Sequence, residues 1–191
     1  MSSTSDDTFN SLRNHFLIAT PVIADGFFNR SLTYLCEHNA SGAMGIVINH
    51  CLDTNLSEIL KHLKIEALPS LEDRPVLAGG PVQMDHGFVL HHGPAHWDES
   101  TEVSQQVCLT TSRDILLAIA SGEGPSEYLL ALGYAGWGAG QLEAEMGLNS
   151  WLTVEADAEI LFNAPASERL AAAGRRLGVN IDLLSAEAGH A

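Results

Sequence analysis

Short apolar runs that end at proline, glycine or asparagine dominate this sequence and limit the folds open to it. Their length and their β-branched and aromatic content are typical of buried strands. Because the runs come in groups, without the regular alternation of strand and helix of a doubly wound sheet, the sequence favours an α+β fold. Strands are predicted at 15–21, 32–37, 45–49, 75–78, 87–91, 107–110, 129–134, 151–154 and 160–162.

Helical spacing of apolar residues predicts the flanking helices. From Leu56 the apolar residues recur at i, i+3, i+4 and i+7, which buries one face of a helix. Thr54 or Asn55 can cap this helix, and Gly122 and Gly178 stand where two others need a left-handed terminal residue. The helices are predicted at 56–63, 113–121, 141–146 and 165–177.

The chain is expected to form one domain, 15–191, after a flexible N-terminal arm, 1–14, that is rich in polar residues. The arm lacks the features of a signal peptide, and no apolar run reaches the roughly 18 residues of a membrane-spanning helix. Cys36, Cys51 and Cys108 show no zinc-type spacing and no disulfide framework, as in a reducing compartment. A cytoplasmic location is therefore expected.

The charge of the chain bears on its partners. Nine Lys and Arg stand against 24 Asp and Glu, which gives a formal net charge of −15. Nucleic acid and anionic lipid repel such a chain at long range, and nucleic-acid-binding domains normally carry a basic stripe. We therefore expect neither direct nucleic-acid binding nor membrane binding.

Polar and glycine residues that packing does not readily explain fall into the segments 25–50, 79–91 and 133–143. The glycines from Gly133 to Gly140 do not form a nucleotide-binding GxGxxG motif, and no phosphate-binding GK[ST] motif follows. They could pack backbone around an aromatic ring or present N–H groups to an anion. Gly79 and Gly80 could likewise serve turn geometry or a ligand.

Histidines and carboxylates offer an alternative, catalytic interpretation. Asp25 or Asp85 with His86 or His91 could perform acid–base chemistry if the fold joins them. Cys36 and His38, two apart in a strand, could form a thiolate pair. His91 and its neighbour His92 point to opposite faces of a strand, and no HExxH or CxxC motif accompanies them. We expect no metal and no cofactor.

Longer stretches of the sequence are specific in combination. They are HFLIATP, YLCEHN, GAMGIVIN, PVLAGGPV, GFVLH, LTTSRDIL, LGYAGWGAGQLE and NSWL, with Asp25, Phe28, Arg30 and Ser31. On these stretches the chain resembles the YqgE/AlgH family from about His15 to Ala191. The resemblance implies a compact cytoplasmic α+β domain with a strongly curved, mixed or antiparallel, barrel-like sheet. It also implies a family without an established activity, one branch of which is named as a regulator of alginate production.

The sequence departs from the family pattern at two cationic positions. His50 stands in Asn49-His50-Cys51 where the family usually has Asn-Arg-Pro, and His86 stands where arginine is common. An anion site built on these positions would depend on pH, since free histidine titrates at about 6.5. Arg30 and Arg113 remain cationic.

We therefore expect a non-catalytic regulatory or adaptor protein that binds a protein partner or a small polar metabolite in a groove. The alternatives are a hydrolase built on the Asp/His pairs and, from the family name alone, a direct DNA-binding regulator, which the charge disfavours. The sequence leaves the oligomeric state open. The residues predicted to line the groove are Arg30, Asn49, Gly79, Gly80, Trp137 and Gln141.

Overall fold

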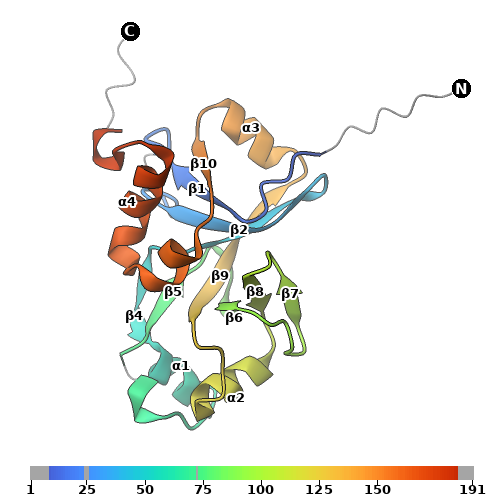
Figure 1. Ribbon diagram of the computed structural model, residues 1–191, viewed down its shortest axis with the longest axis vertical. Coiled ribbons are helices and arrows are strands. Elements are labelled where there is room, and N and C mark those ends of the chain that lie inside the picture. The colour runs from blue at the N-terminus through green and yellow to red at the C-terminus, as the bar shows by residue number, and fades with distance from the viewer. Residues whose placement is uncertain (1–8, 24–25, 72, 185–191) are drawn as a thin grey trace, which may run out of the picture.

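The computed structural model describes residues 9–23, 26–71 and 73–184. Within these residues ten strands form one strongly curled sheet with helices against its faces (Figure 1). The main path of the sheet is β10-β1-β2-β3-β9-β6-β8-β7, and β4 joins it through β5. The α+β class and the strong curvature are therefore confirmed.

The secondary structure is given by the following bounds. The strands are β1 (His15–Ala19), β2 (Leu32–Asn39), β3 (Gly42–Val47), β4 (Cys51–Asn55), β5 (Pro75–Ala78), β6 (Val82–His92), β7 (Ser100–Glu102), β8 (Val107–Thr110), β9 (Tyr128–Gly138) and β10 (Trp151–Glu155). The helices are α1 (Leu56–His62), η1 (Pro69–Leu71), α2 (Arg113–Ser121), α3 (Gln141–Gly147), η2 (Glu159–Asn163), α4 (Ala166–Leu177) and η3 (Ile181–Leu183).

Strand β9 belongs to both halves of the sheet. Near its end it pairs with β3, with Trp137 opposite Ala43. Nearer its start it lies between β5 and β6, with Ala131 opposite both Leu77 and Phe88. The pairing with β5 is parallel, and the other pairings described are antiparallel. We call β10, β1, β2 and β3 the first wing, and β4, β5, β6, β8 and β7 the second wing.

The inner side of the curl holds the largest core. Phe16 and Ile18 of the first wing meet Phe88 and Leu90 of the second wing there, and α4 closes the core with Ala173. All of these side chains are buried. Because alternate residues of a strand point to opposite faces, the residues next to these in sequence point to the outer face of the sheet, which must be covered by other elements.

Separate helices cover the outer faces of the two wings. Helix α3 lies over the first wing, where Leu142 and Leu17 share a cluster. Helices α1 and α2 lie over the second wing, where Leu60, Ile115 and Leu130 share another (Figure 1). Burial on both faces explains why β1 is apolar at successive positions instead of alternating.

Local signals set the helix ends. The side chain of Asn55 accepts from the Glu58 N–H at 2.9 Å, and the Glu58 carboxylate accepts from the Asn55 N–H at 3.3 Å, which forms a capping box. Gly122 and Gly178 end α2 and α4 with φ of 82° and 86°, as predicted. No helix in the described part of the chain is long and apolar enough to span a membrane.

Three parts of the secondary structure differ from the sequence-based expectation. Residues 160–162 lie in the π-type helix η2, where Asp157 accepts from the Glu159 N–H and Leu161 enters the inner core. Strand β9 does not turn after Tyr134, because its glycines go on pairing with β3. Strands β4 and β7 are too polar for their apolar pattern to predict them.

The segment before β1 is bound to the sheet. Ser11 Oγ donates to the carbonyl of His38 at 2.7 Å, and the Leu12 N–H donates to His38 Nδ1 at 2.8 Å. Together with the bond from the Asn14 N–H to the Leu35 carbonyl, they place the last residues of the predicted arm against β2. Residues 1–8 of that arm lie outside the described residues.

Candidate functional site

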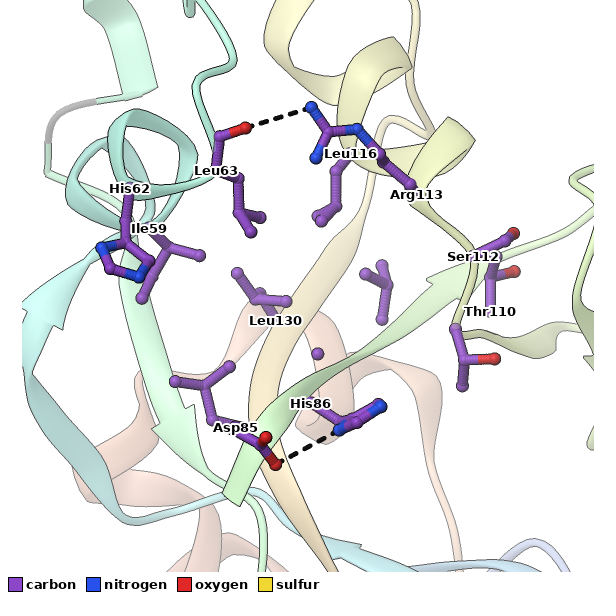
Figure 2. A pocket seen from close by; sticks show the side chains of 14 residues that line it. Ile59, His62, Leu63, Asp85, His86, Thr110, Ser112, Arg113, Leu116 and Leu130 are labelled. Atoms are coloured by element: carbon purple, nitrogen blue, oxygen red, sulfur yellow. Dashed lines mark hydrogen bonds and ion pairs between the residues drawn. The ribbon is translucent and has the colours of Figure 1, made fainter. Parts of the chain in front are cut away.

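A cavity of about 380 Å³ opens between α1, α2 and the outer face of the second wing (Figure 2). Leu130 and Leu132 of β9 lie on its floor. Ile59, Leu63 and Leu116, from the two helices, form its walls. The interior is therefore largely apolar, as in most small-molecule sites.

A bulge in β6 shapes one end of the cavity. Val82 pairs with Tyr134 and Gly87 with Leu132, so residues 83–86 stand opposite the single residue Gly133. Gly87 itself lines the cavity, where a Cβ would make an ordinary van der Waals contact of 3.6 Å with a Leu130 methyl group.

The bulge places Asp85 and His86 at the edge of the cavity (Figure 2). The Nδ1–H of His86 donates to Asp85 Oδ1 at 3.2 Å, and this hydrogen bond lowers the pKa of the Asp85 carboxyl. The side chain of Asp85 is 88% exposed and that of His86 is 65% exposed. Asp85 is thus an ionised, solvated carboxylate at neutral pH.

The opposite end of the cavity carries a cation. Arg113, the first residue of α2, donates from Nη2 to the carbonyl of Leu63 at 3.1 Å, which joins α2 to α1 (Figure 2). His62 of α1 adds an imidazole ring to the lining. No ion pair among the described residues includes Arg113 or His62. The cavity thus has an apolar middle and polar ends of different charge.

A buried hydroxyl chain lies behind one wall. His91 is fully buried, and burial lowers its pKa, so its ring is neutral. Its Nδ1–H donates to the His92 carbonyl at 3.0 Å, so Nε2 accepts from the Thr110 hydroxyl at 2.8 Å. Thr110 in turn accepts from the Ser100 hydroxyl at 2.7 Å. Each proton in this chain has an acceptor, which makes the chain a structural link between β6, β8 and β7.

The structure does not join the predicted catalytic pairs in a cleft. Asp85 and His86 meet only at the exposed edge of the cavity, and the ring of His91 bonds to hydroxyl and carbonyl groups instead of a carboxylate. Asp25 lies outside the described residues. Among the described residues, no group of three or more His, Cys, Asp or Glu could hold a metal ion.

Cys36 and His38 do not form an activated pair either. Cys36 is buried in the inner core, and burial raises the pKa of its thiol. His38 is engaged elsewhere: Nδ1 accepts from the Leu12 N–H, so Nε2–H donates to Glu143 Oε1 at 2.6 Å. A bulge in the pairing of β2 with β3 falls at this point.

The predicted groove glycines bring backbones close together. A Cβ on Gly79 would lie 2.4 Å from the Gly133 carbonyl oxygen, and one on Gly80 would lie 1.9 Å from the Tyr134 carbonyl carbon. Both glycines are buried. The close approach of β9 accounts for the absence of side chains at both positions, without turn geometry or a ligand.

Trp137 and Gln141 belong to a clamp that the sequence does not reveal. Trp137 and Trp151 are 7% and 5% exposed, and their indole N–H groups donate to the same oxygen, Glu145 Oε2, at 2.9 and 2.8 Å. Gln141 Nε2 donates to the other oxygen, Glu145 Oε1, at 3.1 Å. The i, i+4 spacing of Gln141 and Glu145 on α3 is the only trace of this clamp in the sequence.

Arg30 and Asn49 lie together, away from the cavity. Asn49 Oδ1 accepts from the Leu32 N–H at 2.8 Å, and Asn49 Nδ2 donates to the Arg30 carbonyl at 2.9 Å. The Arg30 guanidinium donates to Asp182 at 3.1 Å. None of the six predicted groove residues lines the cavity between α1 and α2, and their common groove stays a prediction.

Comparisons with known proteins extend over nearly the whole chain. The family described as AlgH-like matches residues 16–182. A UPF0301 protein of Saccharophagus degradans is 52% identical over 96% of this chain and 90% of its own. The UPF0301 protein AlgH of Pseudomonas aeruginosa is 52% identical over 94% of this chain and 96% of its own.

Two solved structures share the fold. The solution structure of the AlgH protein from Pseudomonas aeruginosa aligns with a TM-score of 0.80 at 50% identity and covers 100% of both chains. A crystal structure of a protein from Corynebacterium diphtheriae aligns with a TM-score of 0.69 at 19% identity over 91% of both chains. At that identity the second likeness concerns the fold alone.

Proposed function

The chain belongs to the AlgH-like family, and we propose that it is a non-catalytic regulatory protein that binds a small molecule between α1 and α2. The observation that carries the proposal is the cavity of about 380 Å³ with an apolar floor and polar ends. Its volume lies within the roughly 300–1,000 Å³ typical of small-molecule sites.

The lining favours a ligand with an apolar body and polar ends. Burial of apolar surface on Leu130 and Leu132 would contribute roughly 25 cal/mol per Å². Arg113 would bind an acceptor or anion at one end, and the Asp85–His86 pair would bind a hydrogen-bonding group at the other. The polar metabolite expected from the sequence is thus narrowed to a partly apolar one.

The polar groups of the cavity support binding more than catalysis. A general base works best with a pKa near the working pH, whereas the pKa of Asp85 is lowered. Behind the wall, the His91 ring and the hydroxyls of Thr110 and Ser100 are already engaged in hydrogen bonds. A net charge of −15 speaks against direct DNA contact, so we place any effect on transcription at the level of a ligand or protein partner.

The test uses two adjacent leucines of α2. Leu116 faces the cavity, whereas Leu117 is 47% exposed. A tryptophan at Leu116 would fill the cavity, and the same substitution at Leu117 would not. Native mass spectrometry of the protein mixed with a metabolite extract should reveal a bound species with wild type and Leu117→Trp, and none with Leu116→Trp.

Two outcomes would contradict the proposal. One is the absence of any bound species with the wild-type protein across extracts from several growth conditions. The other is a species that Leu116→Trp still binds as tightly as wild type. Circular dichroism of both variants establishes that the tryptophan has not unfolded the chain.

A further inference from the structure

Arg169 of α4 is a buried cation without a counter-charge among the described residues. The residue is 5% exposed. Its Nη1 donates to the Ile48 carbonyl at 2.6 Å, whereas the buried Nε has no hydrogen-bond partner among the residues that the structure describes. None of the ion pairs among the described residues includes Arg169.

Such an arrangement is costly unless something else binds there. A buried charge normally requires an opposite charge and complete hydrogen bonds, and a neutral carbonyl supplies only one acceptor. Because Nη1 is occupied, Nε and Nη2 form the edge of the guanidinium that makes no hydrogen bond to the described residues. This edge matches the two oxygens of a carboxylate or a phosphate.

The chain around Arg169 carries further polar groups, one of them the cation Arg30. Ile48 leads directly into Asn49, His50 and Cys51, and Asn49 ties Arg30 to this segment through its Nδ2. His50 is partly buried beside the Phe27 ring, with centroids 6.0 Å apart, and because burial lowers its pKa its ring would take part as a neutral hydrogen-bond donor. Cys51 is exposed and lies near Arg169, whose pKa is lowered by burial.

The carboxylate that the described part of the chain offers to this group is held loosely. Asp182 accepts from Arg30 at 3.1 Å, but the two side chains are 80% and 61% exposed, respectively. Exposed ion pairs of this kind contribute little and exchange readily with solutes. Arg30 is therefore available to a ligand in a way that a buried arginine pair would not be.

We propose that Arg169, with Arg30 and His50, binds a small oxyanion, either a phosphate or a carboxylate group. The anion would accept from the Nε–Nη2 edge of Arg169, approaching from the side of the exposed Cys51. This site is separate from the cavity, because α4 contacts β1, β2 and β10 of the first wing, whereas α1 and α2 cover the second (Figure 1).

Thermal unfolding in matched salts tests the site with inorganic phosphate, acetate and chloride as probes. An anion that binds only the folded state raises Tm in a saturable way. We expect phosphate or acetate to raise the wild-type Tm beyond chloride at equal ionic strength. Arg169→Met should abolish the rise, and Arg30→Gln should weaken the apparent affinity at least tenfold. Arg175→Met, on the exposed side of the same helix, is the control and should leave it unchanged.

The comparison of phosphate with acetate distinguishes the two anion classes, and NMR locates the site. Bound anion should shift the backbone amides of residues 48–51 and leave those of 59–63, beside the cavity, unchanged. The proposal is wrong if neither anion exceeds chloride, if Arg169→Met retains the rise, or if the shifts centre on 59–63. Should Arg169→Met fail to fold, Arg30→Gln decides, and unchanged affinity in that variant overturns the proposal.

Discussion

The carboxylate of Glu145 holds two buried tryptophans, and its removal should destabilise the first wing measurably. In Glu145→Ala the indole N–H groups of Trp137 and Trp151 lose their common acceptor. Hydrogen bonds to a charged group contribute about 1.5–3 kcal/mol each. Because Glu145 is only partly buried and water can replace part of the loss, we expect about 2–4 kcal/mol for the two bonds together.

The corresponding change in Tm is large enough to measure. For a chain of 191 residues, 1 kcal/mol shifts Tm by about 2–4 °C, which places Glu145→Ala about 5–15 °C below wild type. Glu145→Gln keeps an oxygen that both indoles can reach but removes the charge, so it should lie between the two. Thermal unfolding followed by tryptophan fluorescence gives the order of the three proteins.

NMR gives an independent reading of the same bonds. The indole N–H resonances of Trp137 and Trp151 should both move in Glu145→Ala. The resonance of Trp97, which stacks on His96 far from this clamp, serves as the internal reference. A Tm of Glu145→Ala within 1 °C of wild type, or equal losses for the alanine and glutamine variants, would refute the assigned role of the shared acceptor.

Further predictions concern titration, close backbone contacts and thiol reactivity. Because burial lowers the pKa of His91, the unfolded chain binds a proton first as the pH falls. Stability should therefore be complete above about pH 6.5 and decrease below it, by at most about 1.4 kcal/mol per pH unit from this group. Urea unfolding should show a shallower pH slope for His91→Gln; equal slopes would contradict this role. Gly80→Ala should not fold, since its Cβ would lie 1.9 Å from a Tyr134 carbon, whereas Gly147→Ala, with open space around it, should match or exceed the stability of wild type in thermal unfolding. Soluble, folded Gly80→Ala would show that β9 can move away. Cys51 is exposed and should react with maleimide in the native protein, whereas Cys36 and Cys108, whose thiol pKa values are raised by burial, should react only in denaturant, as peptide mass spectrometry can determine. Equal native reactivity of the three thiols would contradict the burial of the last two.

Much of the secondary structure could be predicted because its signals are local. Asn55 and Glu58 lie three residues apart and form their capping box within one turn. Gly122 ends α2 by adopting a left-handed conformation, which requires no contact with a distant residue. The strand predicted at 160–162 shows the limit of such reasoning, since a short apolar run fits a strand and a buried helix equally well.

The site could not be predicted because its parts meet only in the folded chain. The cavity depends on α1 and α2 lying side by side, and the bond that joins them, from Arg113 to Leu63, spans 50 positions. The sequence signals that glycine is required at Gly80, but not that the neighbour is the backbone of β9. The burial of Arg169 likewise depends on a contact with Ile48, 121 positions away.

The place of β9 in both wings has a consequence for how the protein is made. The strands that flank it, β3, β5 and β6, all precede it in the chain, so on the ribosome each keeps an open hydrogen-bonding edge until its part of β9 has emerged, which for β3 extends to Gly138. The second partner of β1, β10, is synthesised later still, after β9. Neither wing can therefore close early during synthesis, and exposed edges of this kind are the surfaces on which nascent chains aggregate or recruit chaperones.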